Sequence, residues 1–336
     1  MRMFRLMALA AVVAFGLIAC DPDDGTPDAG NTKTKLTVFA AYATPIEEPW
    51  DKVIHEALID ARDRGQIDYT WHEAIGYDGS MEGVLREAAG KFPDAIFGDA
   101  FGNEEAVRKV AAEFPAVRFV FGSGFGPAEP NLSVFDNWIH EPAYLCGMLA
   151  GKLTTSGKIG VVGGMAVAEV NRIVNAFIAG AKETNPEALV YVDFIDSWYD
   201  PTKAASTAEA QVTKGADVLF AERAGVIEVA KAHGLLAFGN MSDQNAAAPQ
   251  TVVTGPVWNM RPTVQYVVSQ IHANTYTAQD LKDFSMMAKG GASLAPFHGF
   301  AETLDPNLLT QINERSAKIM SGLFRVPILE EQPPTD

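Results

Sequence analysis

Cysteine is nearly absent from this chain. Only Cys20 and Cys146 occur among its 336 residues, so no framework of disulfides can hold the fold together. Stability must come from a packed core, and a chain of this length fits two domains better than one. Cys146 lies on the apolar face of a predicted helix, where we expect a packed core thiol.

Basic residues are also scarce relative to acidic ones. The chain has 26 Lys and Arg against 42 Asp and Glu, a net charge of −16. Contact with nucleic-acid phosphates needs clustered Lys and Arg, so nucleic acid is not an expected partner. Beyond the N-terminus no second run of about 20 apolar residues occurs, and we expect the body of the protein to be soluble.

Catalytic and metal-binding motifs are missing. No His-Glu-x-x-His spacing or Gly-x-Ser-x-Gly elbow is present, and no glycine-rich run is followed by the Lys-Ser/Thr of a phosphate loop. We therefore expect no metal, no cofactor and no enzymatic activity. A hydrolase that uses Glu169 or Asp99 with His140 remains an alternative, although no spacing favours it.

The first 20 residues have the organisation of an export signal. Arg2 and Arg5 precede an apolar core at 6–18, which is followed by Ala19 and Cys20. This ending resembles the lipobox of bacterial lipoproteins, which implies a signal peptide at 1–19 and a lipid on Cys20. An uncleaved anchor or an ordinary signal peptide is the alternative. Cleavage would remove two arginines and change the net charge from −16 to −18.

The segment after Cys20 has the composition of a linker. Residues 21–34 read DPDDGTPDAGNTKT and contain no aromatic or large aliphatic residue. Such a sequence cannot bury apolar surface, so we expect 20–34 to be a disordered tether. The expected location is the periplasmic side of the cell envelope, and Asp21 favours the inner membrane.

From Lys35 onward, strand and helix patterns alternate. Strands are predicted at 36–42, 67–74, 94–97, 117–121, 132–135, 158–162, 189–195, 216–221, 235–238 and 252–254. Helices are predicted at 49–64, 80–91, 103–113, 142–153, 167–184, 201–214, 225–233 and 259–273. This order predicts an α/β protein with parallel, doubly wound sheets, and the rhythm that restarts near Lys158 indicates two lobes. We expect a first lobe of 35–137 plus about 255–290, and a second lobe of 138–254 plus about 291–330.

The candidate site residues follow the predicted strands, because ligands of open α/β sheets bind at the carboxyl ends of strands. Four of the five tryptophans fall in these connections together with several carboxylates, which suits a flat, polar, nitrogen-rich ligand. The alternative is that these tryptophans cap the hydrophobic ends of the sheets. The candidate ligand-binding residues are Trp50, Asp99, Phe101, Trp138, Glu169, Trp198, Glu222, Asn240, Asp243 and Trp258.

Several runs resemble the basic membrane protein family of substrate-binding lipoproteins of ABC importers, which is related to the purine nucleoside receptor of spirochaetes. The matching runs are EPAYLCGMLAGK at 141–152, GKIGVVGG at 157–164, NAFIAG at 175–180, WYDPTK at 198–203, GADVLF at 215–220 and GLFRVP at 322–327. The resemblance covers about 36–327. It implies a type I periplasmic-binding fold, in which two lobes close on a ligand about a hinge.

The resemblance also implies roles for individual residues. Trp198 would stack on a purine ring, and Trp50 would lie in the ligand loop of the first lobe. Asp99, Phe101 and Asp243 would lie in further ligand-facing loops. The sequence departs from the nucleoside-binding branch at 43–50, ATPIEEPW, and at 239–244, where Asn240 replaces an aspartate expected on the ribose.

The function expected from the sequence is a lipid-anchored, monomeric solute-binding protein of an ABC importer. It would bind a purine nucleoside or nucleobase between two lobes, with a permease and an ATPase as partners. A sensor receptor of the same fold and a binder of a non-purine small molecule are the alternatives.

Overall fold

The computed structural model describes residues 35–336, and within this range the chain forms one compact unit. The expected signal peptide, Cys20 and the whole of the expected tether lie outside the described residues. The first lobe is built on a sheet of five parallel strands in the order β2-β1-β3-β4-β5. The strands are β1 (Leu36–Ala41), β2 (Ile67–His72), β3 (Ala95–Asp99), β4 (Arg118–Gly122) and β5 (Leu132–Phe135).

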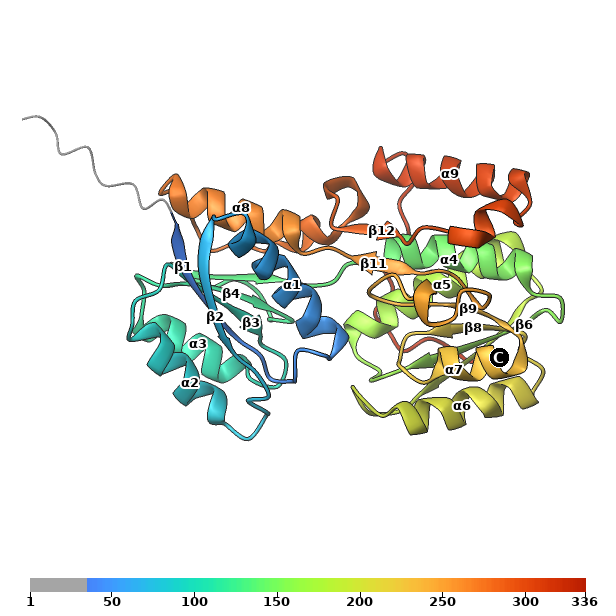
Figure 1. Ribbon diagram of the computed structural model, residues 1–336, viewed down its shortest axis with the longest axis horizontal. Coiled ribbons are helices and arrows are strands. Elements are labelled where there is room, and N and C mark those ends of the chain that lie inside the picture. The colour runs from blue at the N-terminus through green and yellow to red at the C-terminus, as the bar shows by residue number, and fades with distance from the viewer. Residues whose placement is uncertain (1–34) are drawn as a thin grey trace, which may run out of the picture. The chain divides into compact units, whose positions relative to one another are not determined.

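Helices cover both faces of this sheet (Figure 1). One face carries α2 (Ser80–Ala89) and α3 (Glu104–Glu113), and the other carries α1 (Pro49–Asp63) and α8 (Arg261–His272), which pack against each other. Two buried clusters form as a result, one on each side of the strands. The strands are therefore apolar on both faces, as parallel sheets require.

The second lobe repeats this plan. Its parallel strands run in the order β10-β9-β8-β6-β7 and are β6 (Lys158–Gly163), β7 (Leu189–Phe194), β8 (Val218–Ala221), β9 (Leu236–Phe238) and β10 (Val252–Thr254). Helices α4 (His140–Leu153) and α5 (Ala168–Thr184) cover one face, and α6 (Pro201–Thr213) and α7 (Val226–His233) cover the other (Figure 1). A short helix, η1 (Asn245–Ala247), precedes β10.

Helices α4 and α5 approach each other at glycines. A Cβ on Gly147 would lie 1.9 Å from the carbonyl oxygen of Phe177, and one on Gly180 would lie 2.0 Å from that of Tyr144. Only a residue without a side chain permits this contact between helix backbones. Cys146, beside Gly147, is fully buried, which confirms the expected core thiol.

Three connections join the lobes. The first follows β5, and the other two are β11 (Pro256–Trp258) and β12 (Ala292–Leu294), which pair antiparallel. Between β11 and β12 the chain enters the first lobe, where Val134 exchanges backbone hydrogen bonds with Gln279 and Leu281 at 3.1 and 2.7 Å. Short helices η2 (Lys282–Ser285) and η3 (Met287–Lys289) then lead into β12.

The C-terminal segment adds to the second lobe. After η4 (His298–Glu302), helix α9 (Pro306–Met320) packs on α4. The tail beyond it is held by Asn171 Nδ2, which donates to the carbonyl oxygen of Glu330 at 2.9 Å. The backbone N–H of Val190 donates to the Asp336 carboxylate at 2.8 Å. The tail thereby runs from α5 to the edge strand β7.

The order of predicted strands and helices agrees with the structure through β10, and the helix predicted at 259–273 corresponds to α8. The strand predicted at 67–74 ends at His72, because Ala74 has a φ of 56° and its backbone N–H turns to bond Thr44. The helix α9 and the strands β11 and β12 were not predicted. Both strands have only three residues, which is too short for a pattern of period 2 to be recognised.

Candidate functional site

A narrow cavity lies between the lobes at the carboxyl ends of their strands. Its volume is about 30 Å³, roughly the space of one water molecule. We refer to it as the interlobe cavity. Its walls are formed by Thr44, Glu48, Trp50, Tyr77, Asp99, Phe101 and Ser123 of the first lobe and by Glu169, Trp198 and Arg223 of the second.

Two aromatic rings from different lobes meet edge to face at this cavity. Phe101 follows β3, Trp198 follows β7, and their ring centroids lie 5.1 Å apart with the planes at 89°. A flat ring held between two aromatic faces needs a centroid separation of roughly 7 Å, twice the contact distance of carbon atoms. A stacked ligand therefore requires the lobes to move apart and Phe101 to turn parallel to Trp198.

Local structure fixes the loop that carries Trp198. Asp200 caps α6 by accepting the backbone N–H of Lys203 at 2.9 Å, and Pro201 occupies the first helical turn. Arg223 Nη1 donates to the carbonyl oxygen of Trp198 at 2.9 Å, and its guanidinium lies 5.3 Å from the centre of the Trp198 ring. The ring is therefore held on the second lobe before any ligand contact.

Three carboxyl groups surround the aromatic pair. Burial raises the pKa of Asp99 to about 7, although its carboxylate accepts the backbone N–H of Phe101 at 2.9 Å. Burial also raises the pKa of Glu169 well above its ordinary value, with a further contribution from Asp136. Burial also raises the pKa of Glu48, and the positive charge of Arg223 offsets only part of this rise. A carboxyl group with a pKa near 7, such as Asp99, can accept or donate hydrogen bonds near neutral pH, as recognition of a ring edge requires.

Glu222 connects three loops of the second lobe next to the cavity. It accepts hydrogen bonds from the backbone of Gly164 at 2.9 Å, from Arg223 Nε at 2.7 Å and from Asn240 Nδ2 at 3.2 Å. These bonds join the loops after β6, β8 and β9. Glu222 and Asn240 line an adjoining recess together with Glu48 and Trp198.

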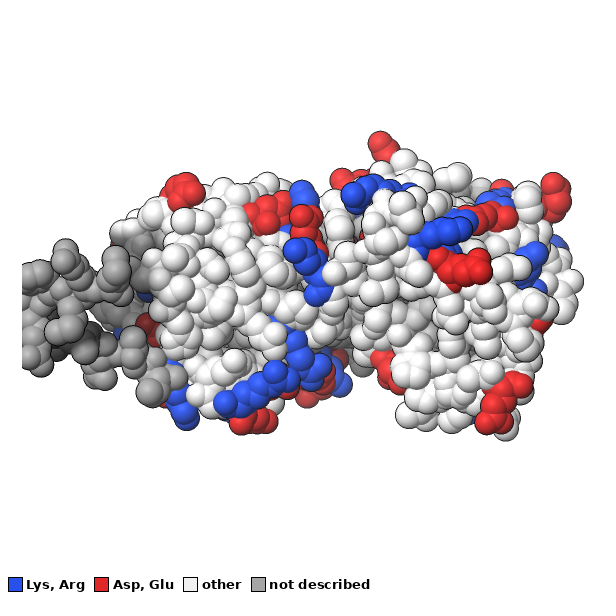
Figure 2. All heavy atoms as spheres, turned by 90° about the horizontal axis from the view of Figure 1, so that it is seen from above, with Lys and Arg blue, Asp and Glu red and all other residues white. Residues whose placement is uncertain are grey.

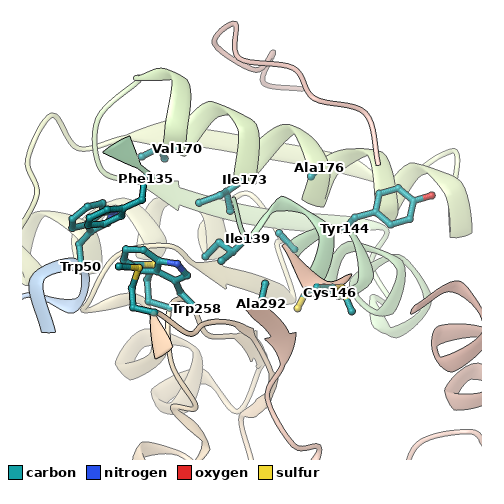
Figure 3. Close-up of a cluster of buried hydrophobic side chains, with 14 of the residues drawn as sticks. Trp50, Phe135, Ile139, Tyr144, Cys146, Val170, Ile173, Ala176, Trp258 and Ala292 are labelled. Carbon is teal, nitrogen blue, oxygen red and sulfur yellow. The ribbon is translucent and has the colours of Figure 1, made fainter. Parts of the chain in front are cut away.

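An aromatic wall closes the cavity on the side of the connections between lobes. Trp50 stacks on Phe135 with centroids 5.7 Å apart and packs against Trp258 at 4.9 Å (Figure 3). Trp258 is buried, and its Nε1–H donates to Ser285 Oγ at 3.2 Å. We call Trp50, Phe135 and Trp258 the aromatic wall.

A second recess begins beside the interlobe cavity and shares Phe101, Ser123 and Glu169 with it. Trp138 lies in this recess, and the centroid of its ring is 4.2 Å from Cζ of Arg172. Arg172 itself is buried and bonds Asp136 at 2.6 Å and Glu330 at 2.8 Å. These ion pairs link the C-terminal tail, through Glu330, to the connection after β5, through Asp136.

The structure brings half of the predicted site residues into the interlobe cavity, and distributes the others around it. Trp50, Asp99, Phe101, Glu169 and Trp198 line the cavity. The remaining five do not: Glu222 and Asn240 lie behind it, Trp138 lies in the second recess, Trp258 lies in the aromatic wall, and Asp243 pairs with His298 at 2.7 Å.

Five cavity residues are not among the candidates predicted from the sequence: Thr44, Glu48, Tyr77, Ser123 and Arg223. All five lie on the connections that follow β1, β2, β4 and β8, so their position after a strand was the available signal. That signal marks a loop but does not say which side chain of the loop turns inward.

Within residues 35–336, no three His, Cys, Asp or Glu side chains are grouped so that they could bind a metal ion. None of the helices in the same range combines the length and the apolar character needed to span a bilayer. On the face seen in Figure 2, acidic and basic side chains lie in small mixed groups rather than in a patch of one sign.

Comparison with known proteins places the chain in a family. The profile described as Bmp, ABC transporter substrate-binding protein PnrA-like, matches residues 36–327. A protein of Brucella abortus named purine-binding protein is 30% identical over 304 residues, which cover 88% of this chain and 83% of that protein. The nucleoside-binding protein BmpA of an ABC transporter of Lactococcus lactis is 24% identical and aligns with 67% of this chain and 66% of its own length.

Solved structures share the fold. An ABC transporter solute-binding protein of Conexibacter woesei has a TM-score of 0.70 at 23% identity and covers 88% of this chain and 100% of its own. A solute-binding protein of Aeropyrum pernix has a TM-score of 0.72 at 18% identity, with coverages of 87% and 94%. The fold is the type I periplasmic-binding fold. Proteins of the matching family bind the substrates of ABC transporters outside the cytoplasm and are not enzymes. The chain belongs to the PnrA-like family of ABC transporter substrate-binding proteins.

Proposed function

We propose that this protein binds a purine, as a nucleobase or a nucleoside, between its two lobes and delivers it to the permease of an ABC importer. The observation that carries the proposal is the aromatic pair Phe101 and Trp198, one ring from each lobe, with carboxyl groups around it. Aromatic faces stack on a purine, while carboxylates accept its N–H donors. The similarity to the purine-binding protein of Brucella abortus supports the same ligand class.

Two observations favour the free base over the nucleoside. The aromatic wall fills the side of the cavity next to the connections between lobes, and Trp50 and Trp258 touch each other there. At the position where the family resemblance expects an aspartate for the ribose, Asn240 gives its amide N–H to Glu222 instead. A ribose would have to displace buried aromatic side chains.

Binding is expected to close the lobes. A ligand shifts the equilibrium between open and closed arrangements only by its differential affinity for the two, and a ring gripped from both lobes supplies such a difference. We propose lobes of 35–137 plus about 255–290 and of 138–254 plus about 291–330. The packing of α8 on α1 and of α9 on α4 supports this division.

Calorimetric titration with adenine, hypoxanthine, adenosine and guanosine tests the ligand class. We expect saturable binding of the bases and weaker binding of the nucleosides. Trp198→Ala should abolish the response, whereas Trp71→Phe is the matched control, because Trp71 lies on β2 away from the cavity. No saturable binding of any purine would refute the purine proposal and leave the family unchanged.

We further propose that the mature protein is a monomer anchored by lipid on Cys20, at the periplasmic face of the inner membrane. The basic, apolar and small-residue order of 1–20 supports this anchor. Cys20→Ser should abolish incorporation of labelled palmitate and release the protein from membrane fractions. Unchanged labelling in Cys20→Ser would refute the anchor, and membrane separation on a density gradient distinguishes inner from outer membrane.

A further inference from the structure

One acidic and one basic side chain meet across the interlobe cavity. Glu48 Oε1 of the first lobe lies 3.8 Å from Arg223 Nη1 of the second lobe. This distance is too long for a hydrogen bond between them. Both side chains are about nine-tenths buried, with 10% and 11% of their surface exposed. Water therefore competes weakly for them, and a hydrogen bond formed here is strong.

Helix capping fixes the orientation of Glu48. Its Oε2 atom accepts the backbone N–H groups of Trp50 at 2.8 Å and Asp51 at 3.2 Å, at the start of α1. Its Oε1 atom makes no hydrogen bond to any part of the chain between residues 35 and 336. One oxygen is thus used by the fold, and the other is presented toward Arg223.

Protein partners likewise fix Arg223 but use only three of its five N–H groups. Its Nε and Nη2 atoms bond Glu222, and Nη1 donates to the carbonyl oxygen of Trp198 at 2.9 Å. A guanidinium has five N–H groups, two of them on Nη1. A second Nη1 proton therefore remains, and Glu48 is the carboxylate nearest to it across the lobes.

We propose that Glu48 and Arg223 together recognise a ring edge that carries an N–H donor beside an acceptor, and that this contact sets specificity within the purines. The inference rests on the proposed function. Glu48 Oε1 would accept the N–H, and Arg223 Nη1 would donate to the neighbouring nitrogen or oxygen. Adenine offers its 6-amino group beside N1, and hypoxanthine offers N1–H beside the 6-oxo group. Because the two partners belong to different lobes, the same contact favours closure.

A comparison of adenine with 6-methylpurine tests this recognition in the unaltered protein. The methyl group resembles the amino group in size but offers no hydrogen to Glu48, while the acceptor N1 is kept. We expect 6-methylpurine to bind about 10- to 100-fold more weakly, the range for one hydrogen bond to a charged group. The titration is carried out at pH 8, since burial raises the pKa of Glu48 and a higher pH favours its ionised form.

The variant Glu48→Ser assigns the preference to Glu48. Serine retains the helix cap but withdraws the carboxylate from the cavity. Adenine should then bind no better than 6-methylpurine, and the affinity for 6-methylpurine should change less than twofold. Glu47→Ser, at the exposed neighbouring position, is the control and should keep the preference.

The possible failures are distinguishable. If the protein binds no purine, the proposed function is wrong and the inference falls with it. If adenine binds but 6-methylpurine binds within twofold of it, the proposed function stands and the recognition by Glu48 and Arg223 is wrong. If Glu48→Ser still prefers adenine over 6-methylpurine, the recognition by Glu48 and Arg223 is also wrong.

Discussion

The indole Nε1–H of Trp50 donates a hydrogen bond to Oε1 of Glu169 at 3.1 Å, and this bond crosses from the first lobe to the second. Trp50 belongs to the first turn of α1, and Glu169 belongs to the first turn of α5. The same indole stacks on Phe135 beside the first connection. Movement of the lobes must therefore change the surroundings of Trp50, so its fluorescence should report closure.

Trp50→Phe should weaken ligand binding. Phenylalanine can keep the stacking on Phe135, but it lacks the N–H that reaches Glu169. We expect a loss of about three- to tenfold in affinity for adenine, as for one neutral hydrogen bond. Titration calorimetry measures it, with Trp71→Phe as the control. Equal affinity of the variant and the unaltered protein would show that this bond does not contribute to the bound arrangement.

The stability of the protein should fall as pH rises toward 7. Burial raises the pKa of Asp99 from 3.8 to about 7, so between these values the folded protein holds a proton that the unfolded chain has lost. The free energy of unfolding therefore decreases with pH in this window, by at most about 1.4 kcal/mol per pH unit for one group. Glu169 has a raised pKa and acts in the same direction.

Urea denaturation of the protein and of Asp99→Asn between pH 4 and pH 8 checks this slope. Asparagine cannot ionise, so the variant should lose stability less steeply over the window. Parallel curves for the two proteins would mean that Asp99 titrates at an ordinary pKa in the fold.

Gly122→Ala should disturb the aromatic wall. Gly122 ends β4, and a Cβ there would lie 1.8 Å from Trp50 Cη2 and 2.8 Å from Phe135 Cε2. We expect a loss of about 1–3 kcal/mol in the free energy of unfolding, as for overpacking of a core, together with weaker adenine binding. Chemical denaturation and titration measure the two effects.

The matched control for this change is Gly83→Ala. Gly83 is exposed in the middle of α2, and an added Cβ meets no atom within 4 Å. Alanine there should stabilise by about 0.5–1 kcal/mol, because glycine is unfavourable inside a helix. A Gly122→Ala variant that behaves like this control would show that Trp50 relocates at no cost.

Gly180→Ala should destabilise the second lobe. An added Cβ would lie 2.0 Å from the carbonyl oxygen of Tyr144, and backbone cannot yield as a flexible side chain can. The helices α4 and α5 would have to separate, at a cost of about 3 kcal/mol. Thermal unfolding measures the loss, and a transition temperature equal to that of the unaltered protein would contradict the close contact of the two helices.

Much of the fold could be predicted from the sequence, because both sheets are parallel and their strands read as apolar runs between amphipathic helices. Two of the sequence runs that resemble the family also have a physical explanation. They contain Gly147 and Gly180, the residues at which the backbones of α4 and α5 come into contact. The path of the chain after β10 could not be predicted. Strands β11 and β12 are three residues long, and only their mutual pairing defines them.

The site was only partly predictable for a different reason. A position after a strand selects a loop, and this rule gave Asp99, Phe101 and Trp198. It does not tell a side chain that faces the cavity from one that bonds elsewhere. Asp243 turns to His298, while Arg223 is drawn into the cavity wall by Glu222 beside it. Such choices depend on contacts between residues far apart in the chain.

The two ends of the described chain belong to different lobes. The N-terminal end enters the first lobe at β1, whereas the tail after α9 is bonded to α5 and β7 of the second lobe. If Cys20 carries the proposed lipid, the membrane holds only the first lobe. The second lobe would then be linked to the membrane only through the three connections between the lobes. An affinity tag after Asp336 would lie on the second lobe, and one placed in the tether would lie on the side of the first.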